Sequence, residues 1–255
     1  MKPVYPASII LLALVMTACN LSGDKGNSSA DPSAPAPEVS VKFTGVRSYQ
    51  SGGRLDKEVS FVKGVRNGLT KSYYPAGGVK QIINYTNGLK TDTAKWFYED
   101  GSLFRSTPYV NDTIHGLQCQ YYRSGRLKAS MSYIMGNRVA DLEEYYDNGK
   151  IKIFRREITI IKRDEYAERG VYKIFAELDN KSTPVKFYRG ELKNGVFNTE
   201  MVSEITTSGG TGLLELTRGI SGNEGYVGII AEYTTDFGNK NYLYKKVTVP
   251  YRDVN

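Results

Sequence analysis

The side chains that could support catalysis are few and scattered. His115 is the only histidine in the chain, and Cys119 follows it on a segment that reads as a strand. A reactive thiolate needs a basic or electropositive neighbour, so we interpret Cys119 as a small core residue, with a catalytic thiol as the alternative. The adjacent carboxylates Glu143 and Glu144 would point to opposite faces of a strand and could not act as a pair. We therefore expect no catalytic residues, no metal site and no cofactor.

Cys19 is the residue with the clearest predicted chemistry. A short apolar run from Ile9 to Met16 is followed by Thr17, Ala18 and Cys19. A membrane span needs about 20 apolar residues, so this run is typical of a cleaved signal peptide. Residues 16–19 resemble the bacterial lipobox, whose cysteine takes a diacylglyceryl group and becomes the acylated first residue after cleavage. Residues 1–18 are therefore predicted to be a lipoprotein signal peptide, and Cys19 is the predicted lipidation site. An ordinary secreted protein is the alternative.

The residues after Cys19 predict a tether on a membrane. Residues 19–40 are rich in Ser, Pro, Ala, Asp and Asn and contain no aromatic residue, so they cannot bury enough surface to fold. Two or more acyl chains hold a protein stably on a membrane. Asn20 differs from the aspartate that retains many lipoproteins at the inner membrane. The predicted location is therefore the cell envelope, with the outer membrane favoured.

A period of 24 residues organises the chain from about residue 46 to residue 155. One aromatic column contains Tyr49, Tyr73, Phe97, Tyr121 and Tyr145, and a second contains Phe61, Tyr85, Tyr109 and Tyr133. Turn dipeptides such as Asp100-Gly101 and Asn148-Gly149 separate runs rich in Tyr, Phe, Ile and Val, because glycine takes positive φ without a steric cost. Each repeat is predicted to be one β-hairpin, and residues 41–157 are predicted to be an extended antiparallel meander.

One copy carries the motif most fully: His115-Gly116, then Tyr121-Tyr122 and Gly125, and later Tyr133 with a glycine three residues on. This pattern resembles bacterial variants of the membrane occupation and recognition nexus (MORN) repeat. The resemblance implies the hairpin architecture and a structural place for the histidine. Many bacterial proteins with this repeat carry an antitoxin label, so the resemblance also implies a toxin-neutralising binder as an alternative function. Asp92 and Ala140 replace the glycine of other copies, and we expect looser turns there.

The tyrosines predict the binding surface. The two columns that begin at Tyr49 and Phe61 are interpreted as a cross-strand aromatic core. The next residue along each first-column strand must point to the other face, which gives an exposed row of aromatics. The predicted binding residues are this row, Tyr74, Tyr98, Tyr122 and Tyr146, with the basic neighbours Arg123, Arg126, Lys128, Lys150 and Lys152.

From about residue 158 the period disappears while strand-like runs continue. Residues 227–233 alternate in the manner of a half-buried strand, and breaks such as Asn194-Gly195 and Asp236-Phe237-Gly238 separate the runs. Several short strands over this length favour a β-sandwich for residues 158–255, in an all-β protein. An immunoglobulin-like form, a small barrel and a sheet that extends the repeat array all stay open.

The charge distribution points to the repeats as the binding part. Residues 41–157 contain 19 basic and 11 acidic residues, whereas residues 158–255 contain 13 of each. A basic face interleaved with tyrosines attracts anionic partners, although a solvated face is the alternative. We expect a non-enzymatic module that binds an envelope protein or an anionic envelope component. Nucleic acid is not an expected partner, and a hidden hydrolase is the least favoured reading.

Overall fold

The computed structural model describes residues 42–179, 184–219 and 224–255. The predicted signal peptide (1–18), the lipidation site Cys19 and the tether (19–40) lie outside the described residues. Residues Val41–Asn255 form one unit, and its regular structure is nearly all β, as predicted. Within the described ranges the helix α1 (Tyr166–Arg169) has four residues, and no helix there is long and apolar enough to cross a membrane.

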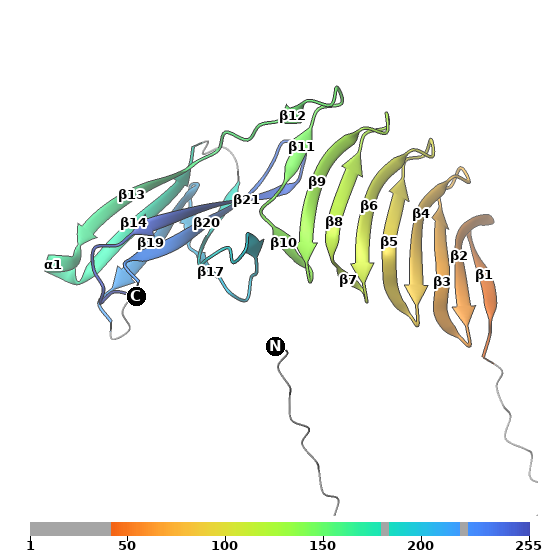
Figure 1. Cartoon of the computed structure of the whole chain (residues 1–255), viewed down its shortest axis with the longest axis horizontal. Coiled ribbons are helices and arrows are strands. Elements are labelled where there is room, and N and C mark those ends of the chain that lie inside the picture. The colour runs from red at the N-terminus through yellow and green to blue at the C-terminus, as the bar shows by residue number, and fades with distance from the viewer. Residues whose placement is uncertain (1–41, 180–183, 220–223) are drawn as a thin grey trace, which may run out of the picture. The chain divides into compact units, whose positions relative to one another are not determined.

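The repeats form one antiparallel sheet in which neighbouring strands largely follow the chain order (Figure 1). Its strands from the repeat region are β1 (Gly45–Ser51), β2 (Arg54–Val62), β3 (Val65–Tyr73), β4 (Val79–Thr86), β5 (Leu89–Phe97), β6 (Leu103–Val110), β7 (Thr113–Ile114), β8 (Gly116–Tyr121), β9 (Leu127–Ile134), β10 (Asn137–Val139), β11 (Glu143–Tyr145) and β12 (Ile151–Lys152). The predicted extended meander of hairpins is therefore confirmed.

Two kinds of turn alternate along the sheet and explain the glycine columns. At one edge the turn residues Asn87 and Gly88 have φ values of 50° and 88°, which suits a two-residue hairpin turn. At the other edge Gly101 has a φ of 84°, and its N–H donates to the Tyr98 carbonyl at 3.0 Å. Each repeat therefore needs a residue that tolerates positive φ at both of its ends.

The expectation of a looser turn is wrong at Asp92, and at Ala140 it stays a prediction. Gly68 and Asp92 lie within strands β3 and β5 rather than in turns. Asp92 keeps the positive φ of the glycine column, at 60°, and its side chain accepts a hydrogen bond of 2.6 Å from the Asn84 amide. Asp tolerates this left-handed conformation better than most residues because its short polar side chain finds local partners.

The predicted aromatic core is only partly present. Tyr85 in the second column is buried, but Tyr49 in the first column is 43% exposed and the other members of both columns are half-buried. The buried centre of the sheet is instead a line of small and medium side chains. This line contains Val59, Thr70, Ile83, Ala94, Thr107, Gln118 and Met131.

Residues from 158 onward form two sheets that share one core, as predicted for a sandwich. The first sheet has the order β13 (Ile158–Glu165), β14 (Val171–Leu178), β19 (Thr211–Thr217), β18 (Thr207–Ser208). The second has the order β17 (Ser203–Ile205), β15 (Val185–Arg189), β20 (Tyr226–Thr234), β21 (Lys240–Thr248). Ile174 from one sheet and Phe187 and Ile229 from the other are fully buried in the shared core. The orders β13-β14-β19 and β15-β20-β21 match the A-B-E and C-F-G strand sets of immunoglobulin-like sandwiches.

Two hairpins of the sandwich part copy the turns of the repeats. Asn194 and Gly195 have φ values of 53° and 75°, and the following strand β16 (Val196–Phe197) pairs with β10 as a continuation of the repeat sheet. At Thr235 the N–H donates to the Asn239 carbonyl at 2.8 Å, which repeats the closing hydrogen bond of the Tyr146 turn. A repeat array needs a cap at its end, and these two hairpins supply one.

Candidate functional site

The predicted tyrosine row is a hydrogen-bonded ladder between repeats. The hydroxyl of Tyr74 donates to the Phe97 carbonyl at 2.7 Å, and the hydroxyl of Tyr98 donates to the Tyr121 carbonyl at 2.9 Å. Tyr122 repeats the contact one hairpin later, at 2.7 Å. These three side chains are half-buried, so the expectation of an exposed row is wrong for them.

Tyr146 ends the ladder and differs from the other three. It is 47% exposed, and its ring packs edge-on against Phe237 of the capping hairpin, with 6.0 Å between the ring centroids. A binding role for Tyr146 stays a prediction.

The predicted basic residues do not form one patch. Arg123 bonds Asp100 at 2.9 Å and lies 4.5 Å from the centre of the Tyr98 ring, while Arg126 donates to the Asp147 carbonyl at 2.6 Å. Lys128 lies over the rings of Tyr122 and Phe237, and no side-chain contact is described for the exposed Lys150. Hydrogen bonds from the Ser102 side chain and backbone, and then from Arg123, lower the pKa of Asp100 to about 2.

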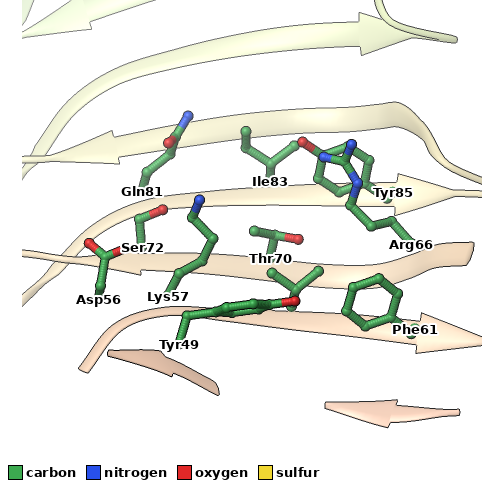
Figure 2. A pocket seen from close by; sticks show the side chains of 11 residues that line it. Tyr49, Asp56, Lys57, Phe61, Arg66, Thr70, Ser72, Gln81, Ile83 and Tyr85 are labelled. Atoms are coloured by element: carbon green, nitrogen blue, oxygen red, sulfur yellow. The ribbon is translucent and has the colours of Figure 1, made fainter. Parts of the chain in front are cut away.

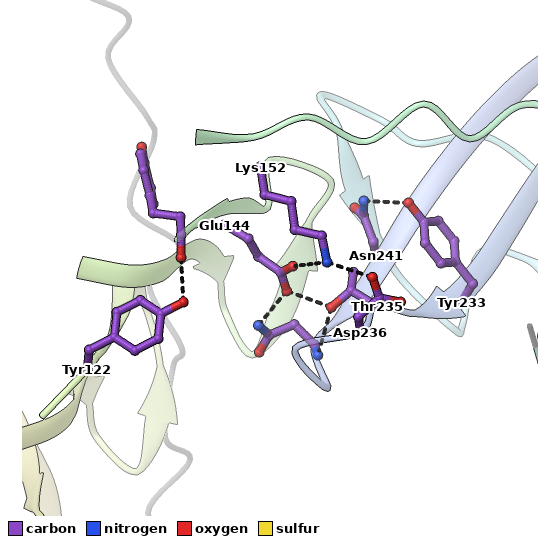
Figure 3. A network of polar contacts seen from close by, with 9 residues as sticks. Tyr122, Glu144, Lys152, Tyr233, Thr235, Asp236 and Asn241 are labelled. Atoms are coloured by element: carbon purple, nitrogen blue, oxygen red, sulfur yellow. Dashed lines mark hydrogen bonds and ion pairs between the residues drawn. The ribbon is translucent and has the colours of Figure 1, made fainter. Parts of the chain in front are cut away.

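Lys152 belongs to a buried network that joins the last repeat to the capping hairpin (Figure 3). Glu144 is fully buried and accepts hydrogen bonds from the Thr235 hydroxyl at 2.6 Å and the Asn239 amide at 2.8 Å. The Lys152 ammonium lies 2.8 Å from Asp236 and 3.8 Å from Glu144. These contacts satisfy most of a charge that would be costly to bury alone, so the network has a structural role.

One face of the repeat sheet collects side chains that the sequence reading did not single out. We call it the Val59 face, because it contains Val59 and the buried line given above. Beside that line, towards the edge with the tyrosine ladder, residues that are directly opposite on neighbouring strands form a continuous row. The row contains Tyr49, Lys57, Ser72, Gln81, Trp96, Arg105, Gln120, Ala129, Glu144 and Lys152. Its one carboxylate is the buried Glu144.

Cations lie over aromatic rings along this face. Arg105 is 4.2 Å from the centre of the Trp96 ring. On the far side of the buried line, Arg66 lies over Tyr85 at 4.9 Å, Lys90 over Tyr109 at 5.2 Å and Arg138 over Tyr133 at 5.2 Å. Stacking holds a guanidinium in place without neutralising it, so the N–H groups of the exposed Arg66 stay able to bind an anion, whereas Arg138 already donates to the Lys240 carbonyl at 3.2 Å.

The face is hollowed over β1 to β4 (Figure 2). The hollow has a volume of about 400 Å³. Val59 and Ile83 lie in its apolar part, and aromatic rings and polar side chains surround them. The residues that line it are Tyr49, Asp56, Lys57, Val59, Phe61, Arg66, Thr70, Ser72, Gln81, Ile83 and Tyr85. This volume lies at the lower end of the range for small-ligand sites.

The hollow contains a buried hydroxyl without a partner. Thr70 is 8% exposed, and within the described part of the chain its Oγ1 makes no hydrogen bond. Buried polar groups are usually paired, so an orphan that faces a hollow points to a missing ligand or water. The alternation of side chains along paired strands could have predicted that Thr70 lies beside Val59. The sequence gives no sign that the Thr70 hydroxyl lacks a partner.

The residues first considered for catalysis lie apart. His115 Nδ1 accepts a hydrogen bond from the Met135 N–H at 3.3 Å, and Cys119 is half-buried on the opposite face, level with Ser106 and Ser130. Among the described residues no group of three His, Cys, Asp or Glu side chains could hold a metal ion.

Comparison with known families identifies part of the repeat sheet. Residues 66–87, 93–111 and 114–135 match the MORN repeat variant, which supports the MORN part of the resemblance seen in the sequence. MORN repeats are generally associated with binding to proteins or to membrane lipids. No curated protein matches the chain.

Proposed function

We propose that the protein is a non-enzymatic lipoprotein of the bacterial cell envelope that binds an anionic envelope component, or a protein with an acidic surface, through the Val59 face. The observation that carries this proposal is the set of stacked cations Arg66, Lys90 and Arg105 on that face, where Asp56 is the one carboxylate that lines the hollow. A field of one sign raises the local concentration of an oppositely charged partner.

The proposed location follows from the sequence. The lipid on Cys19 would hold the chain on a membrane, in our proposal the outer membrane, and residues 19–40 would keep the repeat sheet clear of the lipid headgroups. Replacing Cys19 by Ala should abolish palmitate labelling and release the chain from the membrane fraction. Labelling that persists in this variant would contradict the proposed anchor.

The binding proposal is tested by capture from crosslinked, detergent-solubilised envelopes. The test variant carries Lys90→Gln and Arg105→Gln on the Val59 face. The control carries Lys71→Gln and Lys95→Gln, which remove the same charge from the opposite face. Both variants are first checked for unchanged thermal unfolding.

We expect the Val59-face variant to lose the captured material and the control to retain it. Equal loss of the captured material in both variants would show that binding depends only on the total charge. Retention in both would place the binding surface elsewhere. A secreted toxin among the captured proteins would favour the antitoxin-like alternative.

A further inference from the structure

The hollow on the Val59 face has the chemistry of a site for a charged sugar. We propose that it binds a saccharide unit that carries carboxylate or phosphate groups, an assignment that rests on the proposed function of this face. Three features carry the inference: an unpaired buried hydroxyl, two cations at opposite ends of the hollow, and aromatic rings between them.

The Thr70 hydroxyl marks where a ligand atom must reach. Its Oγ1 lies in the hollow and is without a hydrogen bond in the described ranges. A hydroxyl both donates and accepts, so its natural partner is another hydroxyl. Ser72 and Gln81 line the same hollow, and no side-chain hydrogen bond is described for either. These groups favour a ligand rich in hydroxyl groups over a purely apolar one.

Two cations bracket the hydroxyl. Lys57 and Phe61 are four residues apart on β2, a separation of about 13 Å along a strand. Arg66 is directly opposite Phe61, so it stands at the other end of the hollow from Lys57. Both cations are exposed, and neither makes an ion pair within the described residues, although the carboxylate of Asp56 also lines the hollow. One small anion cannot contact both of them, whereas a sugar unit with charged substituents can.

The aromatic side chains complete the site. Figure 2 shows the Tyr49 ring lying along the hollow, with Phe61 and Tyr85 towards the Arg66 end. Aromatic rings offer apolar surface and a weakly negative face to the polarised C–H groups of a sugar ring.

An acidic peptide fits this position less well. An extended peptide gains most of its affinity from backbone hydrogen bonds at a free sheet edge. Strands β2, β3 and β4 are paired on both sides, so a peptide lying across them finds no free backbone groups, and only β1 at the end of the sheet has an unpaired edge. A saccharide brings its own hydroxyl groups to the side chains and needs no free edge.

The test is calorimetric titration of the lipidated full-length chain in detergent. The probes are trigalacturonate, glucose 6-phosphate, neutral maltotriose, pentaglutamate and inorganic phosphate. The variants are Thr70→Val, which removes the hydroxyl at nearly constant shape, and Arg66→Gln. Lys71→Gln on the opposite face is the matched control.

We expect at least one charged sugar to bind, and its affinity to fall about tenfold in each test variant while staying unchanged in the control. The carboxylated and phosphorylated probes distinguish the two kinds of charge. Thr70→Val should fold normally, because its hydroxyl has no partner to lose.

Four results would overturn the assignment. Equal binding of maltotriose would remove the role of charge, and tighter binding of pentaglutamate or phosphate with the same Thr70 dependence would change the ligand class. If a charged sugar binds with the same affinity to both test variants and to the wild type, its binding site lies outside the hollow, and the proposed function is unaffected. If no probe binds but envelope capture still depends on the Val59 face, the sugar proposal fails alone. If that capture also fails, the proposed function fails with it.

Discussion

The hydrogen bonds of the tyrosine ladder can be removed while the aromatic rings stay in place. Replacing Tyr74, Tyr98 and Tyr122 together by Phe deletes three hydroxyl groups, each of which donates to a backbone carbonyl of the next repeat. The edge-to-face contact of the Tyr98 ring with Phe104 would remain. The variant therefore isolates the hydrogen bonds that join successive hairpins.

The expected loss follows from the number of hydrogen bonds. One neutral hydrogen bond contributes about 1 kcal/mol net, and sites one repeat apart should be nearly additive, so the triple variant should lose about 3 kcal/mol. For a folded unit of this size, each 1 kcal/mol corresponds to about 2–4 °C in the unfolding midpoint. We expect a decrease of about 6–12 °C.

The assay is thermal and urea unfolding followed by circular dichroism. Tyr109→Phe is the matched control, because the Tyr109 hydroxyl makes no hydrogen bond in the described chain while Lys90 stacks on its ring in the same way. The control should change the free energy of unfolding by less than about 0.5 kcal/mol. A triple variant as stable as the wild type, with envelope capture abolished, would refute the structural role and restore the binding row predicted from the sequence.

Three further predictions concern the cap, a surface carboxylate and a turn. Replacing the buried Glu144 by Ala should cost about 3 kcal/mol in urea unfolding, because the neighbouring hydroxyl, amide and ammonium groups lose their shared partner. A change below about 1 kcal/mol would contradict the capping network. Asp100 should titrate with a midpoint of about 2 by NMR, and Ser102→Ala should raise that midpoint, since Ser102 is the largest cause of the shift. Its pKa is lowered in the folded state, so its contribution to stability is present above its ordinary pKa of 3.8 and is lost as the pH falls towards 2. Gly101→Ala should destabilise the protein by about 1 kcal/mol or more because Gly101 has a φ of 84°. An unchanged midpoint of thermal unfolding would contradict the positive φ of that turn.

The repeat architecture was predictable because its signals are local. Positive-φ residues and aromatic columns recur with a period of 24, and each marks a feature of one hairpin. The faces were harder to assign. Register shifts, for instance between Ser72 and Tyr73, break the simple alternation of side chains, so a residue cannot be placed on a face by counting from the turn.

The candidate site depends on relations between repeats, which is why the sequence reading missed it. The basic residues beside the tyrosine turns stand out in the sequence, but Arg123 and Lys152 are occupied by acidic partners. The cations that stay accessible, such as Arg66 and Lys90, each lie over an aromatic ring of another strand. The cap could not be predicted either, because the hairpin turn that contains Phe237 has the geometry of a repeat turn but lies far from the periodic region in the sequence.

The most direct test of the account is site-specific photocrosslinking in intact cells. A photoreactive amino acid placed at Gln81 reports on the Val59 face, and the same residue placed at Lys95 reports on the opposite face one strand away. The account predicts a crosslinked adduct with an anionic envelope component, or with a protein that has an acidic surface, from Gln81 and none from Lys95. Adducts from Lys95 alone would contradict the claim that the Val59 face is the binding surface.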